Sequence, residues 1–302
     1  MVKLPDGRVM EVLLGGDAAG YPLVANHGTP CDMTLYEDWH SICQERGARL
    51  ISASRPGYGE SHRKPHRSIA DVAADTAAIL DRLGHKSFVT LGWSGGGPHA
   101  LACASLLPQR CVAAATLAGV GPYDAEGLDF LAGMGPENVA EFSAAVKGEQ
   151  ELRRWLAENA TGYRSITGKE VADALGGLVP EVDKRALTGE YADHFAAVVR
   201  RSLMNGFDGW IDDDLAFTRS WGFALGQIRI PVTVWQGELD KMVPVTHGRW
   251  LADKIPGATR RIFPGQGHIS LVMGHRSEMV DELLFRAAFR KAKRNCSNTT
   301  SK

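Results

Sequence analysis

The sequence predicts an α/β protein with a mostly parallel sheet, and two observations lead to this class. Short apolar runs alternate with helical patterns over residues 1–121 and again over residues 227–302, which is typical of repeated strand–helix units. Between residues 122 and 226 the strand patterns stop while helical patterns continue. We therefore expect an α/β core in two parts, 1–121 and 227–302, interrupted by a helical cap over 122–226.

The expected strands end in glycine, proline or polar residues, as a strand that runs into a loop should. The first, RVMEVLLGG at 8–16, follows a Pro-Asp-Gly turn and suggests an opening hairpin. The other strands follow in chain order: YPLVANHG at 21–28, ARLISASRPGYG at 48–59, SFVTLGW at 87–93, VAAATLAGVG at 112–121, IPVTVWQGELD at 230–240 and TRRIFPGQGH at 259–268.

Helical patterns lie between these strands. Residues 68–84 give the clearest one, because Ser68 stands in the N-cap position and Asp71 follows three residues later, as in a capping box. Gly84 supplies the stop at its C-terminal end. A last helical pattern runs into a polar tail from about residue 291, which we expect to fray.

The expected cap is rich in aromatic residues. It holds 12 of the 23 aromatic residues of the chain in about a third of its length, along with helical patterns at 137–160 and 191–206. Such an excess favours a helical insertion whose inner face lines an apolar pocket. The alternative is that the rings only pack this small domain onto the sheet. The two alternatives stay open for its three tryptophans, Trp155, Trp210 and Trp221.

The composition excludes several functional classes. The 34 basic and 35 acidic side chains among 302 residues give a net charge of -1, which predicts neither nucleic-acid nor membrane binding. No apolar run approaches the roughly 18 residues needed to span a bilayer, and the N-terminus lacks the apolar region of a secretion signal. Five cysteines without a CxxC pair favour a reducing compartment. We expect a cytoplasmic protein with no metal site.

One serine, in the stretch LGWSGGGPHA at 91–100, stands among four glycines. The pattern Gly92-x-Ser94-x-Gly96 is typical of a turn that presents a nucleophile, whereas Gly95-x-Gly97-x-x-Ala100 resembles a dinucleotide-binding turn. Composition alone would produce about 0.2 matches to the first pattern, so the context must decide. The context is an apolar strand before the serine and a helix with proline in its first turn after it, as a nucleophile requires.

The dinucleotide-binding hypothesis is rejected because the acidic residue that it requires is missing. That fingerprint needs a carboxylate about 20 residues further on, at the end of the next strand, to hold the ribose. Here the next strand ends in TLAGVGPYD, and its first acid, Asp124, lies past the loop. Ser94 is therefore interpreted as a nucleophile.

A serine nucleophile needs a base, and the base needs a carboxylate that orients it. Of the ten histidines, His268 comes directly after the last expected strand, in the glycine-rich loop PGQGH. Asp240 ends VTVWQGELD, just past the preceding strand. We expect Ser94, Asp240 and His268 to form a catalytic triad. Glu238 and Asp124 are the fallback carboxylates, and residues 212–214 (Asp-Asp-Asp) are interpreted as a solvated acidic turn.

An oxyanion formed during acyl transfer needs two N–H donors. One is expected from Gly95, the residue after the nucleophile, and the other from the loop NHGTP at 26–30. Pro30 has no N–H, so Thr29 is the natural second donor. His27, Gly28 and Trp93 are the residues that we expect to shape the turn or contact the substrate, and His27 as a second base is the weaker alternative.

The segments NHGTP, SRPGYGES, GWSGGG, GELDKMVP and GQGH resemble, in order and spacing, the landmarks of the α/β-hydrolase superfamily. The resemblance covers about residues 5–290 and is to the cap-bearing branch that includes soluble epoxide hydrolases. It implies an eight-stranded sheet, a lid inserted after the sixth strand and a hydrolase without a cofactor. Three positions depart from that branch: Ser94 replaces its nucleophilic aspartate, Cys31 a common glycine and Ser54 a common aspartate.

The favoured function is hydrolysis of an ester, lactone or related carbonyl compound through an acyl-enzyme. C–C bond hydrolases, aminopeptidases and perhydrolases resemble the same scaffold, and the residues do not separate them. A binding-only receptor for a small ligand is the alternative of another class. The expected partner is a small apolar or amphipathic carbonyl substrate, with no nucleic acid and no membrane, and a homodimer is left open.

Overall fold

The computed structural model describes the backbone of residues 1–299 and the side chains of residues 1–289. Its centre is a seven-stranded sheet in the order β3-β5-β4-β6-β7-β8-β9, parallel except for β3, which pairs antiparallel with β5. The strands are β3 (Val12–Gly16), β4 (Tyr21–Asn26), β5 (Ala48–Ala53), β6 (Phe88–Trp93), β7 (Cys111–Leu117), β8 (Val232–Gly237) and β9 (Thr259–Phe263). The predicted α/β class is confirmed.

The main sheet has seven strands and not the eight that the resemblance implied. The opening hairpin, β1 (Val2–Lys3) with β2 (Val9–Met10), forms a separate two-stranded sheet. Glu11 separates β2 from β3, because its N–H donates to Ser61 Oγ at 3.0 Å and not to a neighbouring strand. The hairpin therefore stays outside the main sheet, and the long helical segment follows the fifth strand of that sheet.

Helices cover both faces of the sheet because side chains along each strand alternate between two buried cores. Leu23 and Ala25 of β4 belong to one core, and Val24 belongs to the other. The first core also includes residues of α1 (His40–Glu45) and α11 (His268–Thr299). The second includes residues of α2 (Asp71–Arg82), α3 (Gly96–Leu106) and α10 (Val245–Lys254).

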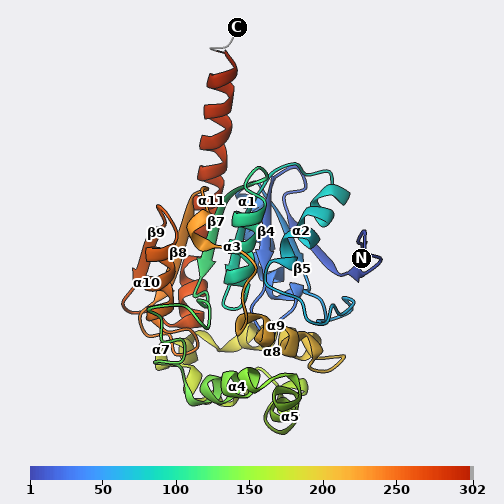
Figure 1. The fold of residues 1–302 in the computed structure, drawn as a ribbon, viewed down its shortest axis with the longest axis vertical. Coiled ribbons are helices and arrows are strands. Elements are labelled where there is room, and N and C mark those ends of the chain that lie inside the picture. The colour runs from blue at the N-terminus through green and yellow to red at the C-terminus, as the bar shows by residue number, and fades with distance from the viewer. Residues whose placement is uncertain (300–302) are drawn as a thin grey trace.

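Residues 118–231, between β7 and β8, contain no strand. Their helices are α4 (Pro136–Lys147), α5 (Glu149–Asn159), α6 (Val171–Ala174), α7 (Glu181–Ala186), α8 (Gly189–Ser202) and α9 (Asp208–Phe217). Short 3₁₀ turns complete the chain: η1 (Met33–Trp39), η2 (Thr161–Arg164), η3 (Gly176–Leu178) and η4 (Leu225–Gln227). We call α4–α9 the helical layer, and it lies at the end of the sheet away from the projecting end of α11 (Figure 1).

The ends of two helices differ from the sequence prediction. α2 begins at Asp71, two residues later than a helix with Ser68 as its N-cap would, and Asp71 Oδ2 accepts from the Ser68 N–H and hydroxyl at 2.7 and 3.0 Å. Gly84 follows α2 with a positive φ of 78°, as expected of a stop. α11 continues through Thr299, so the backbone that we expected to fray is helical as far as it is described. No helix of the described residues is long and apolar enough to cross a bilayer.

Candidate active site

Ser94 occupies the tight turn between β6 and α3. Its φ is +55°, a conformation that a residue with a side chain adopts only when its surroundings enforce it. A Cβ on Gly92 would lie 2.0 Å from the carbonyl oxygen of Gly96, and one on Gly96 would lie 2.0 Å from that of Asn26. Only glycine fits both flanking positions, and the turn presents the Ser94 side chain to a cavity at the carboxyl end of β6.

His268 and Asp240 come together at the same edge of the sheet. His268 begins α11, and its Nδ1 lies 2.7 Å from Asp240 Oδ2. The other oxygen of Asp240 accepts from the N–H groups of Met242 and Val243 at 2.9 and 2.8 Å, which fixes the carboxylate. Because Nδ1 donates to a carboxylate, a neutral His268 carries its free acceptor on Nε2. The ring also stacks on Trp93, with centroids 5.7 Å apart.

The pKa of His268 is raised from its usual value. Burial of the ring opposes the protonated form, but the charge and hydrogen bond of Asp240 outweigh it, with a further contribution from the charge of Asp183. The site therefore stabilises an imidazolium, which is the species that a general base becomes when it takes a proton.

Asp183 of α7 holds the histidine from the helical layer. Its fully buried carboxylate accepts from the three first N–H groups of α11, those of His268, Ile269 and Ser270, at 2.7, 3.2 and 2.9 Å. These N–H groups have no partner within their own helix, so Asp183 caps α11 from 85 residues away. The preceding residue, Gly267, has no side chain, and a Cβ there would lie 2.4 Å from Asp183 Oδ2.

The cavity in front of Ser94 has a volume of about 610 Å³ and lies between the edge of the sheet and the helical layer. Its lining includes Ser94, His268 and many apolar and aromatic side chains of the helical layer. Trp155 and Trp210 are among them, whereas Trp221 is buried elsewhere and packs near Phe223. Of the three tryptophans in the expected cap, two therefore line the pocket, and the third only packs within the protein.

The loop that follows β4 lies against the serine turn. A Cβ on Gly28 would lie 3.3 Å from Ser94 Cβ and 4.0 Å from Ser94 Oγ, so this loop runs close beside the hydroxyl. A Cβ on Gly95 would lie 2.6 Å from Thr29 Oγ1. Gly28, Thr29, Trp93 and Gly95 all line the cavity. The two expected N–H donors therefore belong to segments that meet beside Ser94.

His27 differs from its neighbours in this loop. Its ring is fully buried and is not part of the cavity lining. Nε2 accepts from the Arg55 N–H at 2.9 Å, so in the neutral ring Nδ1 donates to the Gly28 carbonyl at 2.8 Å. Burial, followed by the charge of Arg55, lowers the pKa of His27 well below its usual value. His27 supports the loop and does not line the cavity, where we expected it to contact the substrate.

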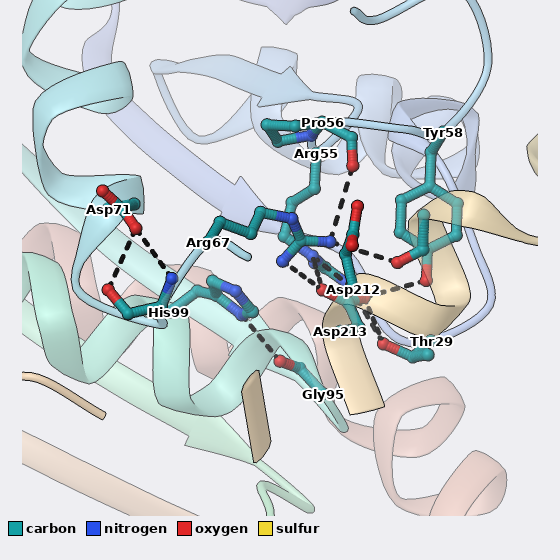
Figure 2. A network of polar contacts seen from close by, with 12 residues as sticks. Thr29, Arg55, Pro56, Tyr58, Arg67, Asp71, Gly95, His99, Asp212 and Asp213 are labelled. Atoms are coloured by element: carbon teal, nitrogen blue, oxygen red, sulfur yellow. Dashed lines mark hydrogen bonds and ion pairs between the residues drawn. The ribbon is translucent and has the colours of Figure 1, made fainter. Parts of the chain in front are cut away.

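The acidic run Asp212–Asp214 is buried, which corrects its interpretation as a solvated turn. Figure 2 shows the polar network around its middle residue, Asp213. The Asp213 carboxylate contacts Arg55 Nη2 at 2.6 Å, Arg67 Nη1 at 2.7 Å, Tyr58 OH at 2.8 Å and Thr29 Oγ1 at 2.6 Å. Burial opposes its charge, yet the two guanidinium groups hold the pKa of Asp213 well below its usual range.

The other two aspartates have different partners. Asp212 Oδ2 lies 2.8 Å from Arg63 Nε, and Asp214 lies beside Glu141 of α4 in the cavity lining. The apolar flanks of GWIDDDLAF, with Trp-Ile before and Leu-Ala-Phe after, were the signal that this run lies inside the protein. The basic loop at 55–67 was the signal for its partners.

A parallel sheet with a strained serine turn and a His–Asp pair at its carboxyl edge defines the class of α/β-fold hydrolytic enzymes. A model of the family described as alpha/beta hydrolase fold matches residues 21–274. The chain belongs to the α/β-hydrolase fold family, as its sequence motifs predicted, and it is an enzyme of that family.

The relatives of this chain include enzymes of several chemistries. It is 25% identical over 273 residues to a non-heme haloperoxidase of Rhodococcus erythropolis, covering 88% of this chain and 92% of that protein. It is 30% identical over 271 residues to an uncharacterised hydrolase of Bacillus subtilis, covering 87% and 89%. The structure of an esterase from Exiguobacterium antarcticum superposes with a TM-score of 0.67 at 20% identity, covering 94% and 97%.

Proposed function

We propose that this enzyme is a serine hydrolase that cleaves an ester or lactone through an acyl-enzyme. The observation that carries the proposal is the His268–Asp240 pair, which shares one edge of the sheet with the strained turn of Ser94. Ser94 and His268 line the same cavity, so a bound carbonyl carbon can meet the nucleophile and the base together.

In the proposed reaction, Ser94 Oγ attacks the substrate carbonyl while His268 Nε2 takes the hydroxyl proton. Asp240 keeps the proton of Nδ1 in place and stabilises the imidazolium that forms. The tetrahedral intermediate collapses, and His268 returns the proton to the leaving alcohol. A water then attacks the acyl-enzyme by the same route, which releases the acid and restores Ser94.

We assign the oxyanion hole to the N–H groups of Thr29 and Gly95. The proximity of the two segments to Ser94 supports this assignment. One such donor typically contributes about 3 kcal/mol of transition-state stabilisation. The Asp213 network supports the loop because it binds the Thr29 hydroxyl at 2.6 Å.

We further propose that residues 122–226 act as a cap that selects the substrate. The cavity is lined mainly by apolar and aromatic side chains, and among the described residues no lysine or arginine lines it. A substrate whose distal end is a carboxylate would have no cationic partner there. This disfavours substrates that carry a carboxylate at that end and leaves uncharged or cationic esters and lactones as the candidates.

The test is turnover of neutral p-nitrophenyl esters and lactones together with labelling by an alkyl fluorophosphonate. We expect hydrolysis, and a covalent adduct that maps to Ser94 by peptide mass spectrometry. Absence of turnover across esters, lactones and amides, combined with tight binding of a small ligand, would instead support the receptor function.

The activity should depend on pH through His268. The ring must be neutral to accept the serine proton, so kcat/KM should fall as pH decreases through the pKa of His268. Because Asp240 and Asp183 raise this pKa, the acidic limb should lie above the usual histidine value of about 6.5. A profile that stays flat to well below pH 6 would contradict His268 as the base.

Asp183 should act as a positioning residue for His268. In Asp183→Asn the N-terminus of α11 loses its anionic cap, and one N–H meets an amide NH₂ in place of an oxygen. We expect kcat to fall about 10- to 100-fold because the base is displaced, and the acidic limb of the pH profile to shift to lower pH. Steady-state kinetics between pH 5 and 9 measure both effects.

The control for Asp183 lies on the same helix. Glu181 has a side chain that is 72% exposed, so Glu181→Gln makes the same change of charge without contacting α11. It should leave kcat and the pH profile unchanged. If Asp183→Asn lowers kcat without moving the acidic limb, its charge does not act on His268.

A further inference from the structure

Two carboxyl groups lie side by side in the wall of the cavity that contains Ser94. Glu141 comes from α4 and Asp214 from α9, and both residues line the cavity although they are only 8% and 1% exposed. α9 carries both Asp214 and, one turn earlier, Trp210, which hydrogen-bonds Glu141, and each of the two carboxyls influences the pKa of the other. Paired carboxyls in an apolar wall must share a proton or bind a cation, because two adjacent buried negative charges repel.

The protein supplies only part of the hydrogen bonding and charge that this pair requires. Trp210 Nε1 donates to Glu141 Oε1 at 2.5 Å, whereas Asp214 Oδ2 is buried and no described group bonds it. Burial and then the charge of Glu141 raise the pKa of Asp214 well above its usual value. Arg67 opposes this shift, but its guanidinium is bound to Asp213, at 2.7 Å.

The rest of the cavity wall shares this negative character. Among the described residues its only other formally charged side chain, apart from His268, is Glu137, and no lysine or arginine lines it. Aromatic side chains surround the pair: the rings of Trp210 and Tyr163 meet edge to face at 6.0 Å, and Trp155 and Phe142 also line the wall. Carboxylates beside aromatic faces form the environment that binds ammonium groups.

We propose that Glu141 and Asp214 form a binding site for a protonated amine on the substrate, so that the preferred substrate is an amine-bearing ester or lactone. The ammonium would take the place of the shared proton and give each carboxylate a charge-assisted hydrogen bond. The acyl group of the same molecule would lie toward Ser94. This inference rests on the proposed function only in that the site lies in the same cavity as Ser94.

The experiment measures binding and not turnover, so it remains valid if the proposed reaction is wrong. Ser94→Ala protein is titrated by calorimetry with three ligands of one framework: 4-phenylbutylammonium, 4-phenyl-1-butanol and 5-phenylpentanoate. We expect the ammonium to bind at least about 10-fold more tightly than the alcohol, and the carboxylate to bind more weakly than either. Equal affinities for ammonium and alcohol would overturn the proposal.

Variants then locate the preference. Adding Glu141→Gln and Asp214→Asn to Ser94→Ala should equalise the affinities for the ammonium and the alcohol while the alcohol affinity stays the same. The matched control, Glu158→Gln with Asp173→Asn, removes two exposed carboxylates of the helical layer that do not line the cavity and should keep the preference. A preference that survives in the first variant would place the cation elsewhere. If that variant does not fold, Glu141→Gln alone should still reduce the preference.

Discussion

Replacing Ser94 by alanine is expected to reduce the hydrolysis of a neutral p-nitrophenyl ester by about 10,000-fold or more. The reason is that no other hydroxyl occupies the strained turn beside His268, so the acyl-enzyme cannot form. What remains would be the modest rate that substrate binding and the oxyanion donors alone provide. Initial rates at saturating ester measure the loss.

The structure of the variant should be preserved, because alanine is smaller than serine and keeps its backbone. Thermal unfolding is therefore expected within a few degrees of the wild type, and fluorophosphonate labelling should disappear. Ser165→Ala, in an exposed turn of the helical layer, is the control and should keep full activity. Retained turnover in Ser94→Ala would show that the nucleophile is another group.

Replacing Asp213 by alanine should produce the largest loss of stability. Arg55 and Arg67 are buried, with relative exposures of 3% and 5%. The substitution removes the carboxylate that pairs with both guanidinium groups and leaves these charges without their partner. Breaking a buried ion pair by removing one partner typically costs about 3–5 kcal/mol. We expect the free energy of unfolding to fall by that amount in chemical denaturation.

The same substitution should lower activity before the protein unfolds, since Asp213 also binds the Thr29 hydroxyl in the loop beside Ser94. Asp81→Ala is the matched control: Asp81 pairs with Arg110 at 2.9 Å, but its side chain is 71% exposed. An exposed pair contributes at most about 1 kcal/mol. If both variants lose equally little stability, the Asp213 network does not stabilise the fold.

Local sequence patterns were sufficient to predict the three candidate catalytic residues and the tight turn of Ser94. Ser94, Asp240 and His268 each follow a strand, and the carboxyl ends of parallel strands meet at one edge of a sheet. The glycines beside Ser94 reflect the close approach of the turn to its neighbours, which any sequence with this turn must allow. Features set by a strand and its adjoining loop could therefore be predicted.

Features set by contacts between distant segments could not be predicted. The opening hairpin ends at Glu11 because the N–H of that residue bonds Ser61, 50 residues away. The main sheet therefore has seven strands and not the eight that the resemblance implied. Asp183 carries no local sign that it caps α11. His27 has the residue type of a site member, but packing turns its ring toward Arg55.

The sequence by itself determined the α/β class, the family and the three residues proposed for catalysis. The reason is that strand–helix periodicity and the glycines of a tight turn are local patterns, each visible within a short stretch of sequence. Only the tertiary structure decided the environment of the charges. Asp213 became the buried anion between two arginines and Asp214 the partner of Glu141, although the two are adjacent in the chain. The burial and partners of a carboxylate depend on segments that its own neighbourhood does not specify, and those contacts determine whether it stabilises the fold or faces a ligand.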